Sequence, residues 1–230
     1  MKFKKPRIIL LSLTLGLVAM LSIPAMAQET EVSEQDKYDL ALRYGDMDVA
    51  KNVLYHRISA EPNNLGLLDT LAMLYFDYQK FTSCILVCRD ILSANPDNFS
   101  ALEMSALSFE NLGLKDKALS NYESMYMKKS NKLVLYKMAA LQFELKRYIE
   151  SNTNLDILLK DPSSDSEQVT FSTGASQISV PLKAAAHNLK GLIKQEEGDK
   201  VAAKQSFESA LEVQPDFSFA QENLKKLAEN

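Results

Sequence analysis

Histidine and cysteine are scarce in this sequence, and their scarcity restricts the chemistry that the chain can perform. Only two histidines occur, His56 and His187, and they lie 131 residues apart. No group of Cys, His and Asp residues has the spacing of metal ligands. A G-x-S-x-G motif and a glycine-rich phosphate loop are also absent. The sequence therefore predicts a protein that is not an enzyme and that has no metal and no cofactor.

Glycine and proline are also few, with seven of each in 230 residues. With 46% hydrophobic and 24% charged residues, the composition is that of a folded chain rather than of a disordered or low-complexity one. Beyond the first seven residues there is no run of basic residues, so a nucleic-acid-binding surface is not expected.

The two cysteines, Cys84 and Cys88, are four residues apart in a segment that we expect to be helical. On a helix their Cβ atoms would lie about 5–6 Å apart, whereas a disulfide requires about 3.8 Å. We therefore interpret them as two small core residues on one helix face. The alternative is that they are oxidised in the compartment to which the protein is exported.

The N-terminus has the organisation of an export signal. Four basic residues among the first seven precede an uncharged apolar stretch over residues 8–23. Pro24 ends this stretch, and Ala25 and Ala27 give the small-x-small pattern of a cleavage site. Together these features predict a secretory signal peptide over residues 1–27. An uncleaved membrane anchor is the alternative, but the stretch is short for a span of about 20 residues.

Cleavage after residue 27 would leave 203 of the 230 residues, with 22 basic and 30 acidic side chains and a net charge of −8. A chain this acidic is not suited to adhere to anionic lipid, and no cysteine near the cleavage site could carry a lipid anchor. We expect a protein in the periplasm or associated with the outer membrane, with no stable membrane span after cleavage.

Self-similarity at a spacing of 34 residues organises the rest of the chain. The small residues Ala50, Cys84 and Ala118 are 34 apart, and so are Pro62 and Pro96. Near the C-terminus the pattern recurs with its best residues, which are Gly191, Gly198, Ala203, Phe207, Ala210 and Pro215.

This pattern resembles the tetratricopeptide repeat family, whose 34-residue unit is a helix–turn–helix. By this resemblance, Gly45, Gly113 and Gly198 end first helices in a left-handed conformation. The small residues expected at close helix crossings are Ala72, Ala106, Ala118, Gly191 and Ala203. The aromatic residues expected to fill the gaps between helices are Tyr75, Phe109, Tyr122, Phe143 and Phe207.

The resemblance implies an all-α fold, a right-handed helical solenoid of about five repeats with a C-terminal capping helix. In one domain over residues 28–230 we place repeats at 31–64, 65–98, 99–132, 133–162 and 184–217, an insertion at 163–182 and a capping helix at 218–229. Three departures stand out. Tyr38 occupies a small-residue position, Ser130 replaces a proline, and residues 145–159 fit better if one residue of their turn is removed.

Residues 168–182 break the helical pattern. Val169 and Phe171, then Ile178 and Val180, alternate with polar residues on either side of Gly174. This predicts a β-hairpin between the fourth and fifth repeats, with these four side chains on one face. Because an isolated hairpin is marginal in water, that face must pack on something. It either packs on its own array or overhangs the groove and offers an edge strand to a partner.

The first helices of such repeats form a concave surface that can hold a peptide or a partner helix. By the resemblance, the groove-facing residues are Asp69, Met73, Phe76, Glu103, Leu107, Glu110, Lys137, Leu141, Glu144 and Asn188. This mixture of acids with apolar residues suits a mildly basic, amphipathic partner. We expect a non-catalytic exported scaffold for a protein or peptide partner; the alternative is an envelope assembly or chaperone-like factor for outer-membrane or glycan-uptake proteins.

Overall fold

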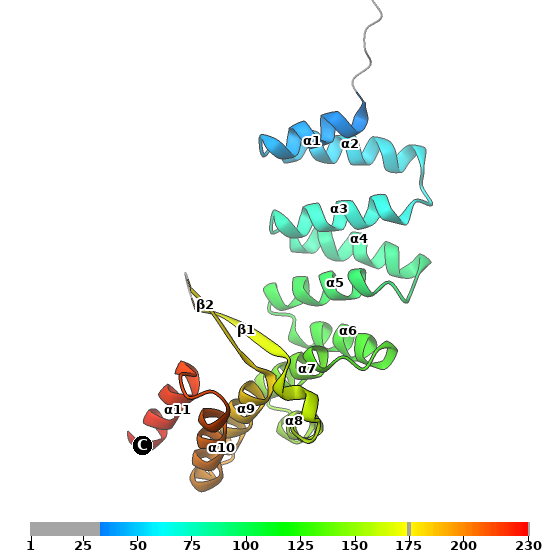
Figure 1. The fold of residues 1–230 in the computed structure, drawn as a ribbon. Helices are drawn as coiled ribbons and strands as arrows, with labels where there is room; N and C mark the ends of the chain where they lie inside the picture. The colour runs from blue at the N-terminus through cyan, green and yellow to red at the C-terminus, as the bar shows by residue number, and fades with distance from the viewer. Residues whose placement is uncertain (1–32, 174–175, 230) are drawn as a thin grey trace, which may run out of the picture.

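A computed structural model of the chain describes residues 33–173 and 176–229, and the expected signal peptide over residues 1–27 lies outside these ranges. The described residues form helices stacked in an elongated array, with one hairpin (Figure 1). The elements are α1 (Glu34–Arg43), α2 (Met47–Ala60), α3 (Leu65–Asp77), α4 (Phe81–Ala94), α5 (Phe99–Asn111), α6 (Lys115–Lys128), α7 (Lys132–Glu144), α8 (Tyr148–Lys160), the 3-10 helix η1 (Pro162–Asp165), β1 (Gln168–Thr173), β2 (Ser176–Pro181), α9 (Leu182–Glu196), α10 (Lys200–Val213) and α11 (Ser218–Glu229).

The first ten helices form five pairs, and a turn of three residues joins the two helices of each pair. The pairs stack in chain order, so that each pair packs against the next. The axes of α9 and α10 run across those of α3 to α5, because the stack twists along its length (Figure 1). A twisted stack of helix pairs is a helical solenoid, which confirms the predicted fold class.

A left-handed backbone conformation reverses the chain at the middle of each turn. Gly45, Gly113 and Gly198 have φ of 69°, 71° and 82°, which glycine adopts readily because it has no Cβ. Gln79 and Lys146 take the same position in the second and fourth pairs, with φ of 57° and 59°. All five pairs therefore share one turn geometry, although two of them lack the glycine.

The fourth repeat departs from the 34-residue spacing at a different place from the one that the sequence indicates. Its turn, residues 145–147, has the usual three residues, so the expectation of a shortened turn is wrong. The missing residue lies earlier, because three residues, 129–131, join α6 to α7, whereas four, 95–98, join α4 to α5. From Lys132 onward, each position of α7 comes one residue earlier than a strict 34-residue spacing predicts.

Small residues occupy the helix crossings, as predicted, and all five of them are buried. The fit is closest at Gly191, where a Cβ would lie 2.5 Å from ring carbons of Phe207. In the irregular first repeat, the Tyr38 ring is buried in a small core formed by α1 to α3. The predicted gap-filling aromatics comprise the buried Tyr122 and Phe207 and the half-buried Tyr75, Phe109 and Phe143.

Polar side chains define where several helices begin. Asn98 and Asn131 accept hydrogen bonds from backbone N–H groups in the first turns of α5 and α7. Asp46 and Asp199 do the same for α2 and α10. Each cap satisfies a donor that the first helical turn leaves without an intrahelical partner, so the loops between helices end at fixed residues.

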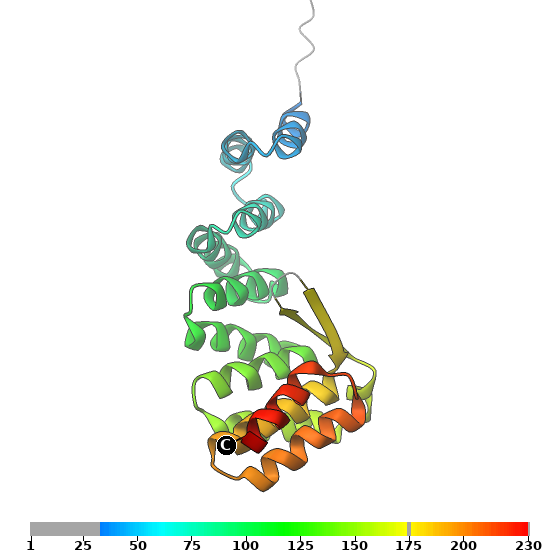
Figure 2. The same ribbon diagram turned by 90° about the vertical axis from the view of Figure 1, so that its left-hand side faces the viewer.

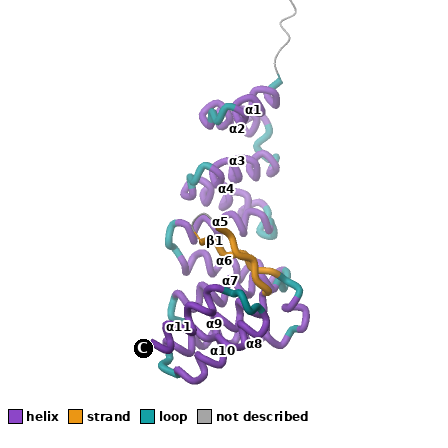
Figure 3. The backbone as a smooth tube through the Cα atoms, turned by 60° about the vertical axis from the view of Figure 1, so that its left-hand side comes forward, coloured by secondary structure: helices purple, strands orange, loops and turns teal. Residues whose placement is uncertain are grey.

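The insertion between α8 and α9 is an antiparallel hairpin of β1 and β2, as predicted. Val169 pairs with Val180, and Phe171 pairs with Ile178, so the four apolar side chains share one face. Figure 3 shows the strands in orange beside the helices. The hairpin projects from the array at the α8–α9 junction.

The last helix, α11, packs against α9 and α10 at the end of the stack (Figure 2). Phe217, just before α11, and Ala220 within it are fully buried. The largest core cluster runs from Leu102 on α5 to Ala220 and includes Val180 of β2. The hairpin and the last helix therefore belong to the same core as the C-terminal half of the array.

Candidate partner-binding surface

The turn residues with positive φ give a common register for comparing α3, α5, α7 and α9. Positions ten, six and three residues before the turn residue lie on one helix face, because they are spaced i, i+4 and i+7. On α3 they are Asp69, Met73 and Phe76, and on α5 they are Glu103, Leu107 and Glu110, which are the residues predicted for the groove. We call this face of the four helices the binding stripe.

On α7 the binding stripe consists of Tyr136, Ala140 and Phe143. The three residues predicted for this helix each lie one position later, because the α6–α7 loop is one residue shorter. Leu141, one of the three, is 3% exposed and belongs to the core, so its assignment to the groove is wrong. The loop length therefore places Tyr136 and Phe143 at the stripe positions for which the sequence predicts Lys137 and Glu144.

Two carboxylates of the stripe make polar contacts within and between helix pairs. The side-chain amide of Asn98 donates to Asp69 Oδ1 at 3.3 Å. Tyr122 Oη donates to Glu110 Oε1 at 2.5 Å, and Lys137 Nζ lies 3.6 Å from the same carboxylate. Burial and the hydrogen bond to Glu110 raise the pKa of Tyr122, so the phenol remains a donor. The carboxylates of Asp69 and Glu110 therefore already accept hydrogen bonds within the array.

Other groups of the stripe remain accessible to a partner. Glu103 is exposed and has no hydrogen bond or ion pair with any other described residue. Met73 is 54% exposed, and Leu107 is half-buried between the acids of α5. Phe76 is half-buried and packs edge-on against Phe81, with ring centroids 5.7 Å apart. On α3 and α5 the stripe therefore presents the apolar side chains of Met73, Phe76 and Leu107 beside three carboxylates.

The stripe ends in a pocket of about 330 Å³, which we call the aromatic pocket. Four separate elements form it, although they are far apart in the sequence. Its lining residues are Tyr136, Ala140, Phe143 and Glu144 of α7, Asn188, Leu189 and Leu192 of α9, Phe171 of β1, and Phe219 and Asn223 of α11. Of the predicted site residues, Glu144, Asn188 and Phe171 meet here.

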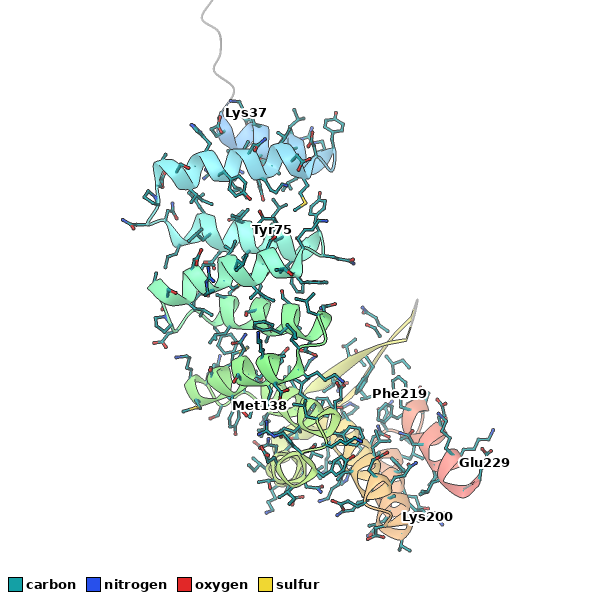
Figure 4. The ribbon with its side chains drawn as sticks, turned by 180° about the vertical axis from the view of Figure 1, so that it is seen from behind. Lys37, Tyr75, Met138, Lys200, Phe219 and Glu229 are labelled. Carbon is teal, nitrogen blue, oxygen red and sulfur yellow. The ribbon has the colours of Figure 1, made fainter. Side chains whose placement is uncertain are left out.

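Phe171 connects the hairpin to this pocket. Its ring lies edge-on to Tyr136 and to Phe219, with centroids 6.5 Å and 5.5 Å away, and stacks on Phe217 at 5.9 Å. Figure 4 shows Phe219 beside the hairpin. Offset and edge-on aromatic pairs of this kind are favourable contacts. The hairpin therefore packs on its own array and, with the same residue, forms a wall of the pocket.

Polar contacts fix the base of the hairpin. Lys132 Nζ on α7 lies 3.1 Å from Glu167 and 3.5 Å from Asp161. The hydrogen bond to Glu167 raises the pKa of Lys132, so the ammonium stays charged. The Leu182 N–H donates to the Glu167 carbonyl at 2.7 Å, and Val180 is 1% exposed. These contacts hold the base of the hairpin in place, and the hairpin in turn positions Phe171 at the pocket.

The pocket also contains polar groups that can bind a ligand. Asn223 Nδ2 donates to Asn188 Oδ1 at 3.0 Å. The amide N–H groups of Asn188 and the side-chain carbonyl of Asn223 have no partner among the described residues. The Tyr136 hydroxyl has none there either, and burial raises the pKa of Tyr136, which keeps the phenol protonated. These groups offer both hydrogen-bond donors and an acceptor.

The described residues, 33–173 and 176–229, also bear on metal binding and on membrane spanning. This part of the chain holds no group of three or more His, Cys, Asp and Glu residues that could bind a metal ion. None of its helices is both long enough and apolar enough to cross a membrane. The two cysteines are fully buried on α4, with sulfur atoms 3.8 Å apart and no disulfide, which confirms their interpretation as core residues.

A twisted stack of helix pairs belongs to the class of helical repeat proteins. Within that class, residues 184–217 match the sequence model of the family described as tetratricopeptide repeat, and the described chain has the fold of tetratricopeptide repeat proteins. No curated protein sequence matches the chain significantly.

Three solved structures illustrate this fold. A tetratricopeptide repeat protein from Parabacteroides merdae is 18% identical, with a TM-score of 0.65 over 85% of this chain and 71% of its own. YrrB, described as a TPR protein with an unusual peptide-binding site, is 11% identical, with a TM-score of 0.64 over 82% and 88%. MamA from Desulfovibrio magneticus is 12% identical, with a TM-score of 0.61 over 80% and 94%. At these identities, the likeness shows the fold.

The sequence does not predict a role for Tyr136, and the same holds for four other residues of the pocket, Ala140, Leu189, Leu192 and Asn223. The sequence predicts Phe143 only as a residue that fills the gap between helices, and it places Phe219 only within the capping helix. The signal that could have identified Tyr136 is the spacing of the helix caps. Asn98 and Asn131 are 33 residues apart, and both cap a helix directly after them. Alignment on these asparagines, instead of on a strict 34-residue spacing, places Tyr136 opposite Glu103.

Proposed function

We propose that this chain is an exported, non-catalytic scaffold that binds a peptide segment or a helix of a partner protein along the binding stripe. The observation that carries this proposal is the aromatic pocket at the end of the stripe, to which the repeats, the hairpin and the last helix all contribute. The tetratricopeptide repeat fold supports it, as does the likeness to YrrB, whose description names a peptide-binding site.

Site-specific photo-crosslinking in native cell envelopes tests the mode of binding. A photoreactive residue at Met73 or Leu107 on the stripe should capture the partner, because both side chains lie on the proposed contact surface. The matched controls are Met127 on α6 and Ile149 on α8, which are 87% and 83% exposed and lie on even-numbered helices. Capture from these control positions, without capture from the stripe, would rule out the proposal.

Export is part of the same proposal, with the periplasm or the outer membrane as the destination. The support is the order of a basic head, an apolar stretch and an Ala-x-Ala pattern in residues 1–27. N-terminal sequencing of the protein from fractionated cells should begin at Gln28. An intact N-terminus in the cytoplasmic fraction would contradict export. It would not contradict the proposal that a partner binds along the stripe.

A further inference from the structure

We propose that the aromatic pocket selects one large apolar side chain that stands next to a basic residue in the partner. This inference rests on the proposed function, because it takes a peptide on the binding stripe as given. The volume of about 330 Å³ is at the low end of the range of about 300–1,000 Å³ typical of ligand sites. Such a space fits a single anchor side chain rather than a whole helix.

The walls of the pocket decide the chemistry of the anchor. The rings of Phe143, Phe171 and Phe219 are half-buried, and Leu192 adds an aliphatic surface beside them. An apolar side chain of the partner would remove this surface from water, which is the main favourable contribution to such binding. Aromatic anchors add edge-on contacts with rings that already lie at right angles to one another.

The polar groups of the pocket suit a peptide backbone. Asn188 and Asn223 hold each other through one hydrogen bond, and this leaves amide N–H groups and a carbonyl oxygen without partners in the described chain. A peptide carbonyl next to the anchor could accept from the amide N–H groups of Asn188, and a peptide N–H could donate to the side-chain carbonyl of Asn223. Because unpaired polar groups disfavour burial, this pair favours a peptide over a purely apolar ligand.

The charge around the pocket determines which residue of the partner can stand next to the anchor side chain. Among the described residues, Glu144 is the one charged residue that lines the pocket, and no described Lys or Arg lines it. Further along the stripe, Glu103 is exposed and has no described partner. Lys115 pairs with Glu144 at 2.8 Å, but both side chains are more than 40% exposed, and exposed pairs exchange partners at little cost. A basic neighbour is therefore attracted, whereas an acidic one is repelled.

The hairpin confines this selectivity to one end of the array. On α5, the positions equivalent to Tyr136 and Phe143 hold Glu103 and Glu110. Phe171 contacts the stripe at the Tyr136 ring of α7, and its other ring contacts are with Phe217 and Phe219 at the last helix. A bound peptide thus has its anchor at the hairpin end and its remaining length along the acidic repeats, which fixes the polarity with which it binds.

Selection from a random peptide library displayed on phage, with the purified protein as bait, tests the proposal. We expect the enriched peptides to share a large apolar residue next to Lys or Arg. Phe171→Ser and Phe219→Ser, on different elements, should each weaken the Kd of the best peptide by about tenfold or more. Glu144→Gln should weaken it by up to about fivefold and reduce its dependence on salt. Ile149→Ser, on exposed α8 surface, should leave the Kd unchanged.

The outcomes separate this inference from the proposed function. Enriched peptides without the apolar–basic pair, no enrichment at all, or binding that is insensitive to both phenylalanine substitutions in folded protein would overturn the inference. Photo-crosslinks from Met73 to the native partner would still support the scaffold in each of these cases. Crosslinks only from the even-numbered helices would overturn both. Circular dichroism melting of each variant establishes that the helical array is intact before binding is measured.

Discussion

Gly191 on α9 lies directly against Phe207 on α10, so close that a Cβ on the glycine would lie 2.5 Å from the aromatic ring. Phe207 is fully buried and has no room to retreat. The contact joins the two helices of the fifth pair, which is the pair whose residues match the repeat family. It shows why a small residue is needed at this point of the repeat.

Gly191→Ala should therefore destabilise the protein, although alanine is the better helix former. We expect a loss of about 1–3 kcal/mol in the free energy of unfolding, typical of overpacked cores, measured by urea denaturation. Gly66→Ala is the matched control, because its Cβ would meet only the end of the Asn64 side chain, at 3.3 Å. The control should be neutral or stabilise by up to about 1 kcal/mol. Equal effects at the two glycines would contradict this account of the contact.

A second overpacking test concerns the middle of the array. Ala118 on α6 is fully buried where α5 and α6 cross. Ala118→Leu should cost about 1–3 kcal/mol, because the added atoms have no cavity to fill. Ser120→Leu, on the exposed side of the same helix, should change stability by less than about 0.5 kcal/mol. A neutral result at Ala118, measured by thermal and urea denaturation, would mean that the repeat register is wrong.

The sequence predicted those elements whose residues carry a local physical requirement. Gly113 and Gly198 mark turns because the backbone there has positive φ. The alternation around Phe171 predicts strands because successive side chains point to opposite faces. Gln79 and Lys146 adopt the same left-handed conformation without glycine, so their turns follow from the packing of the flanking helices and not from local preference.

The aromatic pocket could not be predicted in the same way. Tyr136, Phe171 and Phe219 come from three elements, and no spacing in the sequence relates them. One missing residue before α7 is also enough to shift the groove residues predicted for that helix off the stripe, so that the sequence predicts a surface position for Leu141, which is buried. A fixed 34-residue spacing identifies equivalent positions only within a segment that has no insertion or deletion relative to the repeat.

The base of the hairpin should contribute to stability independently of the pocket. Val180 is 1% exposed and packs in the large C-terminal core. Val180→Ala should cost about 1–3 kcal/mol through lost burial and the resulting cavity. Thr170→Ala is the control, since Thr170 lies on the exposed polar face of the same hairpin, 2.8 Å from Ser179 Oγ. Differential scanning calorimetry should show a lower Tm for the first variant alone. A wild-type Tm for Val180→Ala would mean that the hairpin does not depend on the array.

The buried thiols should report on the opening of the second repeat. Cys84 and Cys88 are fully buried, and the hydrogen bond with Cys84 together with burial raises the pKa of the Cys88 thiol. Because both thiols are fully buried, labelling by iodoacetamide in native buffer should follow local unfolding and be slow. Both thiols should react rapidly in guanidinium chloride, because unfolding exposes them. Their sulfur atoms are 3.8 Å apart, compared with about 2.05 Å in a disulfide, so mass spectrometry of the native protein should show two free thiols.

An exposed cysteine provides the control for this measurement. Ile149→Cys places a thiol on α8 at a position that is 83% exposed, and it should be labelled at the rate of a free peptide. If Cys84 and Cys88 react as fast as this control, α4 is not packed between α3 and α5 in solution. The second repeat would then open readily, and the acidic part of the binding stripe on α3 and α5 could not present a fixed surface to a partner.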